Sequence, residues 1–251
     1  MNIIRLAAIT ATCATLLVSC KKDDPKPVDA TPPNGRVTVA FSNNIDGQPI
    51  TPGSMNFTNA AGNRYGVDVL KYYISNFTFV RSDGSEFNYH IHELMDDSKP
   101  ASLSFTLDSL LNGDYTAVKF QLGVDSLHNH TGNQEGDLNP ANGMIWTWDI
   151  GYNFFKHEGF FLRTNGDTSQ VVFHYGTDNA LLNVTVPITT MKMEGKDRKL
   201  FLNFNLNDAY TSPNNIDFNN DNIRMSDPAD FFWIMSMKQN LADAFTYDKA
   251  E

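Results

Sequence analysis

The sequence predicts an all-β protein built around a single antiparallel β-sandwich domain. Three observations favour this fold class. Apolar and polar residues alternate along several stretches, as they do in strands with one buried face. Apolar residues at helical spacing are confined to one short stretch near the C-terminus. The 251 residues include 18 Phe, 9 Tyr and 3 Trp, which is enough aromatic volume to fill the space between two sheets.

The first expected strands lie in the N-terminal half of the domain. Strict alternation is found at residues 37–41, 103–107 and 118–124. Residues 70–74 and 77–79 also alternate, but with opposite parity. Because a change of parity within a strand requires an extra residue, a bulge or bend is expected near residues 75–76.

The C-terminal half contains the longest alternating run. Residues 146–154 are expected to form one strand with five large side chains on one face, including Trp146 and Trp148. The remaining expected strands are residues 171–175, 184–188, 200–206 and 231–237. Residues 240–245 have helical spacing and are expected to form a short helix. Strands that follow one another without intervening helices favour a sandwich or barrel over a parallel sheet, and we predict the sandwich.

Charge and cysteine content exclude several classes of protein. Asp and Glu outnumber Lys and Arg by 29 to 19, and the formal net charge is −10. A protein that binds nucleic acid must bring cations to the phosphates, so this balance argues against DNA or RNA as a partner. Two cysteines are too few for a disulfide scaffold, a zinc finger or an iron–sulfur site.

The N-terminus predicts export and lipid attachment. Residues 1–19 contain one positive charge followed by an apolar stretch, which is typical of a secretory signal peptide. The sequence Leu-Val-Ser-Cys that ends at Cys20 resembles the lipobox of bacterial lipoproteins, in which the cysteine is acylated after cleavage. Residues 20–35 then form the lipidated cysteine and a Pro-rich tether, and residues 36–251 form the domain. An outer-membrane lipoprotein is expected, facing either the periplasm or the cell surface.

Six histidines are the most informative residues for chemistry. His90 and His92 lie in a strand-like run, where residues i and i+2 share a face about 6.5–7 Å apart. Two imidazoles so placed can hold one metal ion, although a solvated strand face would show the same pattern. His128 and His130 repeat the spacing in a loop-like sequence. The remaining two are single and are expected to be structural, namely His157 and His174.

Other side chains must complete any histidine site, because the domain has no thiolate. Methionine with imidazole suits copper(I), whereas carboxylate with imidazole suits zinc, iron or copper(II). The candidate methionines are Met144, Met235 and Met237, and each would equally suit a core position. Residues 217–222 begin like a calcium loop but lack its glycine, so calcium is the weaker alternative.

A longer motif carries a family resemblance. Residues 143–152 read Gly-Met-Ile-Trp-Thr-Trp-Asp-Ile-Gly-Tyr. With its neighbours, this motif resembles the MbnP-like family of secreted copper-binding proteins, and the likeness spans nearly all of residues 36–247. The supporting segments are residues 72–76, 89–90, 123–126, 136–142, 158–159, 173–176 and 240–245.

The resemblance implies a site for monovalent copper. In the family this site combines a His-x-His pair, a methionine and a tryptophan oxidised to kynurenine by a dihaem cytochrome c peroxidase-like partner. His90 and His92 match the histidine pair. Trp146 or Trp148 matches the modified tryptophan. The methionine would come from the C-terminal expected strand, as Met235 or Met237. His128, His130, His174 and Met144 remain open as ligands.

No motif in the chain points to catalysis. The sequence has no Gly-x-Ser-x-Gly elbow, no phosphate-binding glycine loop and, in the domain, no cysteine nucleophile. We therefore predict a lipid-anchored copper-binding protein that is not an enzyme. The alternative is a surface lipoprotein that binds glycans or nutrients and works with an outer-membrane transporter. A structural lipoprotein without a ligand would have the same composition.

Overall fold

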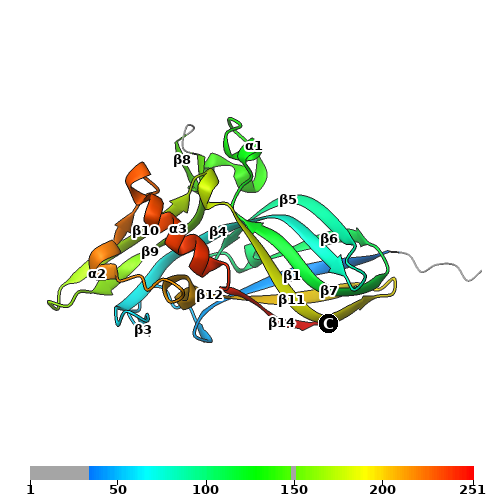
Figure 1. Cartoon of the computed structure of the whole chain (residues 1–251), viewed down its shortest axis with the longest axis horizontal. Coiled ribbons are helices and arrows are strands. Elements are labelled where there is room, and N and C mark those ends of the chain that lie inside the picture. The colour runs from blue at the N-terminus through cyan, green and yellow to red at the C-terminus, as the bar shows by residue number, and fades with distance from the viewer. Residues whose placement is uncertain (1–33, 148–150) are drawn as a thin grey trace, which may run out of the picture. The chain divides into compact units, whose positions relative to one another are not determined.

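The computed structural model describes residues 34–147 and 151–251. The predicted signal peptide, Cys20, nearly all of the tether and Trp148 lie outside the described residues. Within the described part, strands dominate and form two sheets (Figure 1).

The smaller sheet has the strand order β14-β12-β1-β2, with β6 on the other side of β1. Its strands are β1 (Gly35–Ile45), β2 (Gln48–Pro49), β6 (Ser104–Leu110), β12 (Arg198–Asn205) and β14 (Phe245–Ala250). Of its four strand pairings, β1–β12 is parallel and the other three are antiparallel.

The larger sheet is built around β4, which pairs with β3, β5, β7 and β9. Its strands are β3 (Phe57–Thr58), β4 (Arg64–Arg81), β5 (Glu86–Asp96), β7 (Gly113–Leu122), β8 (Ile145–Thr147), β9 (Gly151–Leu162), β10 (Thr168–Gly176), β11 (Leu182–Met193) and β13 (Ile223–Arg224). The β10–β13 pairing is parallel, so both sheets are mixed rather than purely antiparallel.

Aromatic side chains of the two sheets pack against each other. The ring of Phe41 on β1 lies 5.9 Å from that of Phe120 on β7 and 6.4 Å from that of Tyr72 on β4. Tyr72 in turn packs 5.0 Å from Phe204 on β12. Buried rings that interdigitate between two sheets define a sandwich, and the predicted fold class is confirmed.

The expected bulge in β4 is also confirmed. Asn76 adopts a positive φ of 50°. On the β7 side, Ser75 lies opposite Gln121 and Thr78 opposite Lys119, so β4 carries one extra residue there. On the β5 side, Ser75 lies opposite His92 and Phe77 opposite Tyr89. Two residues of β5 therefore face the single residue Asn76.

The long alternating run does not form one strand. Ile145 pairs with Tyr152 in an antiparallel ladder, so the chain reverses between β8 and β9. Gly151 begins β9 with a φ of +95°, a conformation that favours glycine. Alternation alone could not reveal this reversal, because the residues on either side keep the same strand pattern.

The helices are short, and one of them replaces an expected strand. They are α1 (Ser126–Asn129), α2 (Phe218–Asp221) and α3 (Phe231–Leu241), with the 3-10 turns η1 (Pro100–Leu103), η2 (Gly136–Leu138), η3 (Pro140–Asn142), η4 (Asp178–Ala180), η5 (Leu206–Tyr210) and η6 (Pro228–Asp230). Residues 231–237 were expected to be a strand and belong to α3. Its buried residues Trp233, Ile234, Met237 and Leu241 follow helical spacing.

The short helix expected at residues 240–245 is likewise absent from the described structure. Helix α3 ends at Leu241, and β14 begins at Phe245. The apolar spacing there joins the end of a helix to the start of a strand. The pattern is similar to that of a continuous helix, so only the tertiary contacts distinguish the two.

A second aromatic cluster lies beneath α3. Its members are fully or almost fully buried and surround one imidazole: Tyr65, His157, Phe173, Tyr210, Phe218 and Trp233. The His157 ring nitrogen Nδ1 lies 2.6 Å from the hydroxyl of Tyr210. This cluster packs on the part of the larger sheet formed by β4, β9 and β10.

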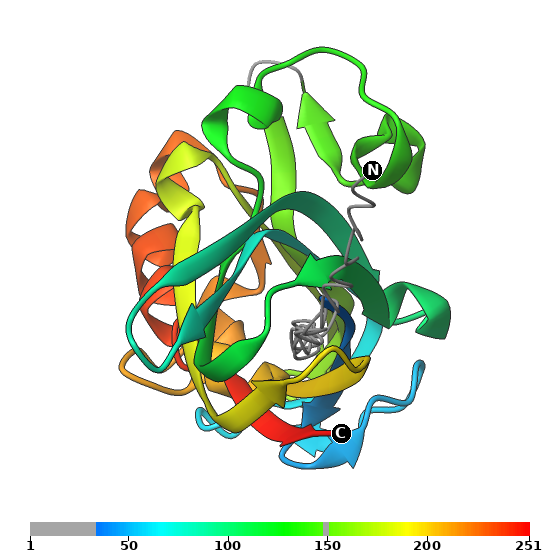
Figure 2. The ribbon, with the colours of Figure 1, turned by 90° about the vertical axis from the view of Figure 1, so that its right-hand side faces the viewer.

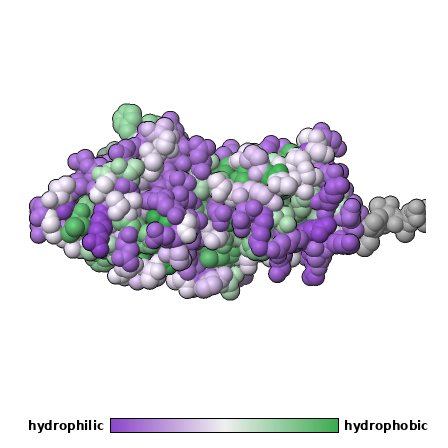
Figure 3. Space-filling view, turned by 90° about the horizontal axis from the view of Figure 1, so that it is seen from below, coloured by the Kyte–Doolittle hydropathy of each residue, from purple (hydrophilic) through white to green (hydrophobic). Residues whose placement is uncertain are grey.

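One face of the molecule is mostly polar (Figure 3). Figure 3 shows one face on which hydrophobic residues occur as separate spots among hydrophilic ones. Within residues 34–147 and 151–251, no helix has the length and apolar character that a membrane span requires.

Candidate metal centre

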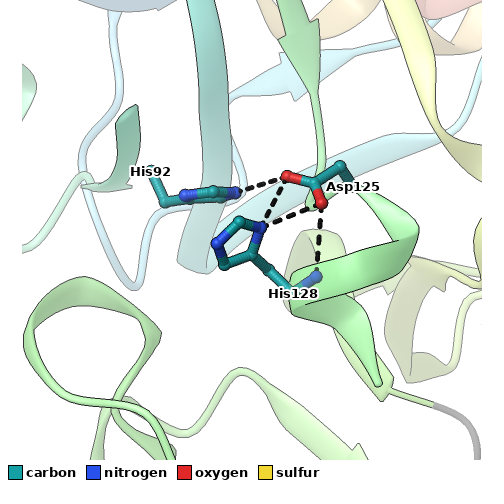
Figure 4. A group of neighbouring side chains, drawn as sticks. All are labelled: His92, Asp125 and His128. Carbon is teal, nitrogen blue, oxygen red and sulfur yellow. Dashed lines mark hydrogen bonds and ion pairs between the residues drawn. The ribbon is translucent and has the colours of Figure 1, made fainter. Parts of the chain in front are cut away.

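Three side chains from two separate segments of the chain meet (Figure 4). His92 comes from β5, Asp125 follows β7, and His128 lies in α1. The Asp125 carboxylate oxygen Oδ2 lies 2.9 Å from Nε2 of His92, and Oδ1 lies 2.9 Å from Nδ1 of His128. The two imidazole rings are 4.3 Å apart at their centroids. Helix α1 and strand β8 lie at the top of Figures 1 and 2.

Asp125 holds His128 through helix capping. As N-cap residue of α1, it accepts a hydrogen bond from the backbone N–H of His128 at 3.2 Å. The same carboxylate contacts the His128 ring, so backbone and side chain are fixed by one group. A local signal for this arrangement exists in the sequence, because the aspartate stands three residues before the histidine.

The bulge separates His90 from His92. His90 is exposed, and its Nδ1 lies 3.3 Å from the side-chain oxygen of Asn76. His92 contacts Asp125 instead. The i, i+2 rule assumes an uninterrupted strand, and the extra residue beside Asn76 breaks that condition. The structure therefore brings together His92 and His128, one from each of the two His-x-His pairs.

The protonation states of Asp125 and His92 are compatible with a bound cation. Partial burial raises the pKa of Asp125, but hydrogen bonds from His128 and His92 outweigh that effect and lower its pKa to about 2. Burial lowers the pKa of His92, against the opposing hydrogen bond from Asp125. At neutral pH the carboxylate is ionised and the His92 imidazole is neutral, which are the protonation states that metal ligands need.

The donor set fits a transition metal. One ligand atom from each of His92, Asp125 and His128 lies within 4.8 Å of the other two, and this is the one such group of three among the described residues. The side chains are 13%, 24% and 40% exposed, so an ion can reach them from solvent. Two imidazoles and a carboxylate suit copper(II), zinc or iron.

A second set of hydrogen bonds anchors α1 at both of its ends. Asp178 of η4 accepts hydrogen bonds from Ser126 Oγ at 2.9 Å and Asn129 Nδ2 at 2.9 Å. It also lies 3.1 Å from Nε2 of His130. The buried Asn129 accepts a hydrogen bond from the backbone N–H of Tyr152. These contacts fix the position of the helix that carries His128.

The predicted methionines lie elsewhere in the fold. Met235 and Met237 belong to α3, which packs against η4, η5 and η6, and not to a final strand. Met237 is completely buried, as is Met144 just before β8. Sequence reasoning did not select Asp125 as a candidate ligand, since single carboxylates in turns are usually structural.

Trp146 lies beside a different histidine. Its ring meets the ring of His174 edge-on at 5.6 Å, and it is 38% exposed. Nε2 of His174 lies 2.7 Å from Oε1 of Glu158, which also pairs with Lys156 at 3.0 Å. The other candidate tryptophan, Trp148, lies outside the described residues.

The remaining predicted sites have structural partners. His157 is buried against Tyr210, and burial lowers its pKa to about 3. In the calcium-like stretch, Asp217 caps α2 and accepts hydrogen bonds from Asn219 N and Asn63 Nδ2, both at 2.9 Å. Its carboxylate thus serves the loop structure.

Comparisons with known proteins agree with the sequence motif. The MbnP family profile matches residues 34–227. Among solved structures, the chain is similar to MbnP from Methylosinus trichosporium, with 18% identity and a TM-score of 0.51 over 78% of this chain and 86% of that chain. This likeness concerns the fold. No curated protein matches the chain. Because the family profile covers most of the domain, the chain belongs to the MbnP family, and the predicted resemblance is confirmed.

Proposed function

We propose that this protein binds copper through His92, Asp125 and His128. The convergence of these three side chains carries the proposal, because one ligand atom from each lies within 4.8 Å of the others. Asp125 orients both imidazoles, and capping fixes His128 relative to the carboxylate. Bound copper would supply a redox-active ion held at the protein surface.

The donor set favours copper(II) over copper(I). A carboxylate is a hard ligand, and soft thioether ligands are those that select copper(I). The methionines expected from the family resemblance lie in α3 and are not needed to complete this group. His90, which the same resemblance assigns to the site, is bonded to Asn76 and serves as a matched control.

The test is a copper titration of the exported chain, with copper(II) and copper(I) in separate experiments. We expect His92→Ala and His128→Ala each to weaken copper(II) binding by about 100-fold or more, since each removes one of three ligands. His90→Ala should change the copper(II) affinity by no more than about twofold relative to the unmodified protein, as for other surface substitutions. Loss of affinity in His90→Ala without loss in His128→Ala would contradict this ligand set.

Tryptophan oxidation is a further part of the proposal. We infer that Trp146 or Trp148 is converted to kynurenine by a dihaem cytochrome c peroxidase-like partner, as the family resemblance implies. The partial exposure of Trp146 supports access by such an oxidant. Peptide mass spectrometry of protein from its own host checks the modification. Two unmodified tryptophans in copper-loaded protein would contradict it.

Lipid anchoring completes the proposed role. Cys20 would carry the lipid, residues 21–35 would form the tether, and the domain would stand off the outer membrane as a binding protein that is not an enzyme. Cys20→Ser should move the protein from the membrane fraction to the soluble fraction of the cell envelope. Unchanged membrane fractionation of that variant would argue against the anchor.

A further inference from the structure

Two phenylalanines at the start of α3 are exposed although the rest of the helix is well packed. Phe231 is 45% exposed and Phe232 is 82% exposed, and their rings meet edge-on at 5.6 Å. The same helix buries Trp233, Ile234 and Met237. Isolated apolar residues are common on surfaces, but a projecting aromatic pair is typical of an interaction site.

A hollow lies on each side of this pair, which we call the Phe ridge (Phe231 and Phe232). The first, of about 690 Å³, is lined by the apolar side chains of Phe231, Ile234 and Pro228, and also by Asp227 and by Asp178 with its partner His130. The second, of about 490 Å³, borders Phe232. The ridge between two hollows can insert into a partner while the partner's side chains enter the hollows.

The charges around the Phe ridge are net negative. In the described part of the chain, the Asp227 carboxylate has no hydrogen-bond or ion-pair partner. Arg224 beside the second hollow is matched by two carboxylates, those of Asp221 and Asp230. Lys238 donates its hydrogen bond to a backbone carbonyl, at 2.8 Å. With Asp178, the carboxylates outnumber the cations, and one is free to pair with an incoming cation.

We propose that the Phe ridge and the larger hollow dock a partner protein that presents lysine or arginine next to an apolar side chain. The apolar walls of the hollow would receive the stem of such a side chain, and Asp227 would pair with its charge. A second copy of this chain would bring the same carboxylates to the interface, and an anionic lipid surface would be repelled. Charge complementarity therefore selects a basic protein partner.

The docking surface adjoins helix α1, which carries the proposed metal ligand His128. Asp178 lines the larger hollow and also holds Ser126 and Asn129 at the two ends of α1. A docked partner would thus touch the residues that position His128. The proposal goes beyond copper binding and does not depend on it, because the Phe ridge and the hollows are present whether or not a metal binds.

The test uses the metal-free exported chain and two defined probes. One is a synthetic twelve-residue peptide of alternating lysine and leucine, and the other carries glutamate in place of lysine. Binding is followed by fluorescence anisotropy at low and high salt. We expect the lysine peptide to bind at low salt, about tenfold more weakly to Phe232→Ser, and about threefold more weakly to Asp227→Asn. The matched controls Phe160→Ser and Asp248→Asn change an exposed phenylalanine and an exposed aspartate elsewhere.

Each other outcome overturns the proposal. Equal binding of the glutamate peptide, or no binding of the lysine peptide, would show that positive charge on the partner does not direct binding. An equal loss in Phe160→Ser would show non-specific adsorption. Binding that survives in Phe232→Ser would exclude the Phe ridge. Dimerisation of the unmodified chain that Phe232→Ser abolishes would assign the surface to a second copy. Since no metal is added, these results are independent of the copper titration.

Discussion

Histidine occupies two contrasting environments in this domain. His157 is completely buried among aromatic rings beneath α3, and its partner is a tyrosine hydroxyl. His92 and His128 lie at the edge of the fold, partly exposed, and share one carboxylate. The first environment keeps an imidazole neutral and out of reach, whereas the second orients two imidazoles toward one carboxylate that solvent can reach. Access and an anionic partner, not the histidine itself, distinguish the candidate ligand from the core residue.

The largest expected effect concerns the aromatic cluster. Phe218 is fully buried against Tyr65, Tyr210 and Phe173. Phe218→Ala should lower the free energy of unfolding by about 3–5 kcal/mol because it leaves a cavity in a closely packed site. Denaturant unfolding measures the change. His128→Ala is the comparison variant and should cost no more than about 1 kcal/mol. Equal losses of unfolding free energy in Phe218→Ala and His128→Ala would contradict the contrast between the buried aromatic cluster and the partly exposed metal-site residues.

Acid sensitivity should come from the buried imidazole. The folded-state pKa of His157 is about 3, below the ordinary value of 6.5, because burial disfavours its charged form. The unfolded chain therefore takes up the proton first as pH falls. Stability is fully present above pH 6.5 and declines by about 1.4 kcal/mol per pH unit toward pH 3, or about 2 kcal/mol at pH 5.

The double variant His157→Leu with Tyr210→Phe checks this assignment. It removes the titrating ring together with the hydroxyl that would otherwise be left unpaired. The difference in unfolding free energy between the two proteins, followed from pH 7.5 to pH 4, isolates the contribution of His157. A constant difference over that range would show that His157 does not cause the acid sensitivity.

A smaller effect is expected where α1 is anchored. Asn129 is buried and accepts the backbone N–H of Tyr152 while donating to Asp178. Asn129→Ala should cost about 1–2 kcal/mol, since it leaves that buried N–H without its acceptor. Copper affinity should fall with it if the anchor positions His128. Lost stability with unchanged affinity would show that the metal ligands are held from the Asp125 end alone.

The smallest effect on stability, with a clear effect on binding, is expected at Asp125. Asp125→Asn keeps the capping oxygen, so the unfolding free energy should change by no more than about 1 kcal/mol. Copper affinity should fall about 10- to 100-fold because the anionic ligand is lost. Denaturant unfolding and copper titration of the same variant measure the effect on stability and the effect on binding separately. A large loss of stability without loss of affinity would make Asp125 a structural residue only.

Strand alternation was a sound guide in the sandwich and a poor one at its edges. The alternating stretches in β1, β4, β7, β10, β11 and β12 are all strands. The parity change near Asn76 marked a real bulge. The errors fell at residues 146–154, where the chain reverses, and at residues 231–237, where a helix has large apolar residues on both faces. Phe231 and Phe232 are apolar although they are exposed, so the run is apolar at nearly every position and its helical period is masked.

The sequence by itself determined the fold class and the family, and it singled out the histidines as candidate metal ligands. These properties depend on local periodicity and on a motif that is continuous in the chain. Only the tertiary structure decided which histidines meet. The bulge beside Asn76 directs His90 and His92 to different partners, and the return of the chain after β7 brings Asp125 and His128 to His92. The ligand group is assembled from segments more than 30 residues apart, as the separation of 33 between His92 and Asp125 shows, and sequence spacing cannot encode such a distance in space.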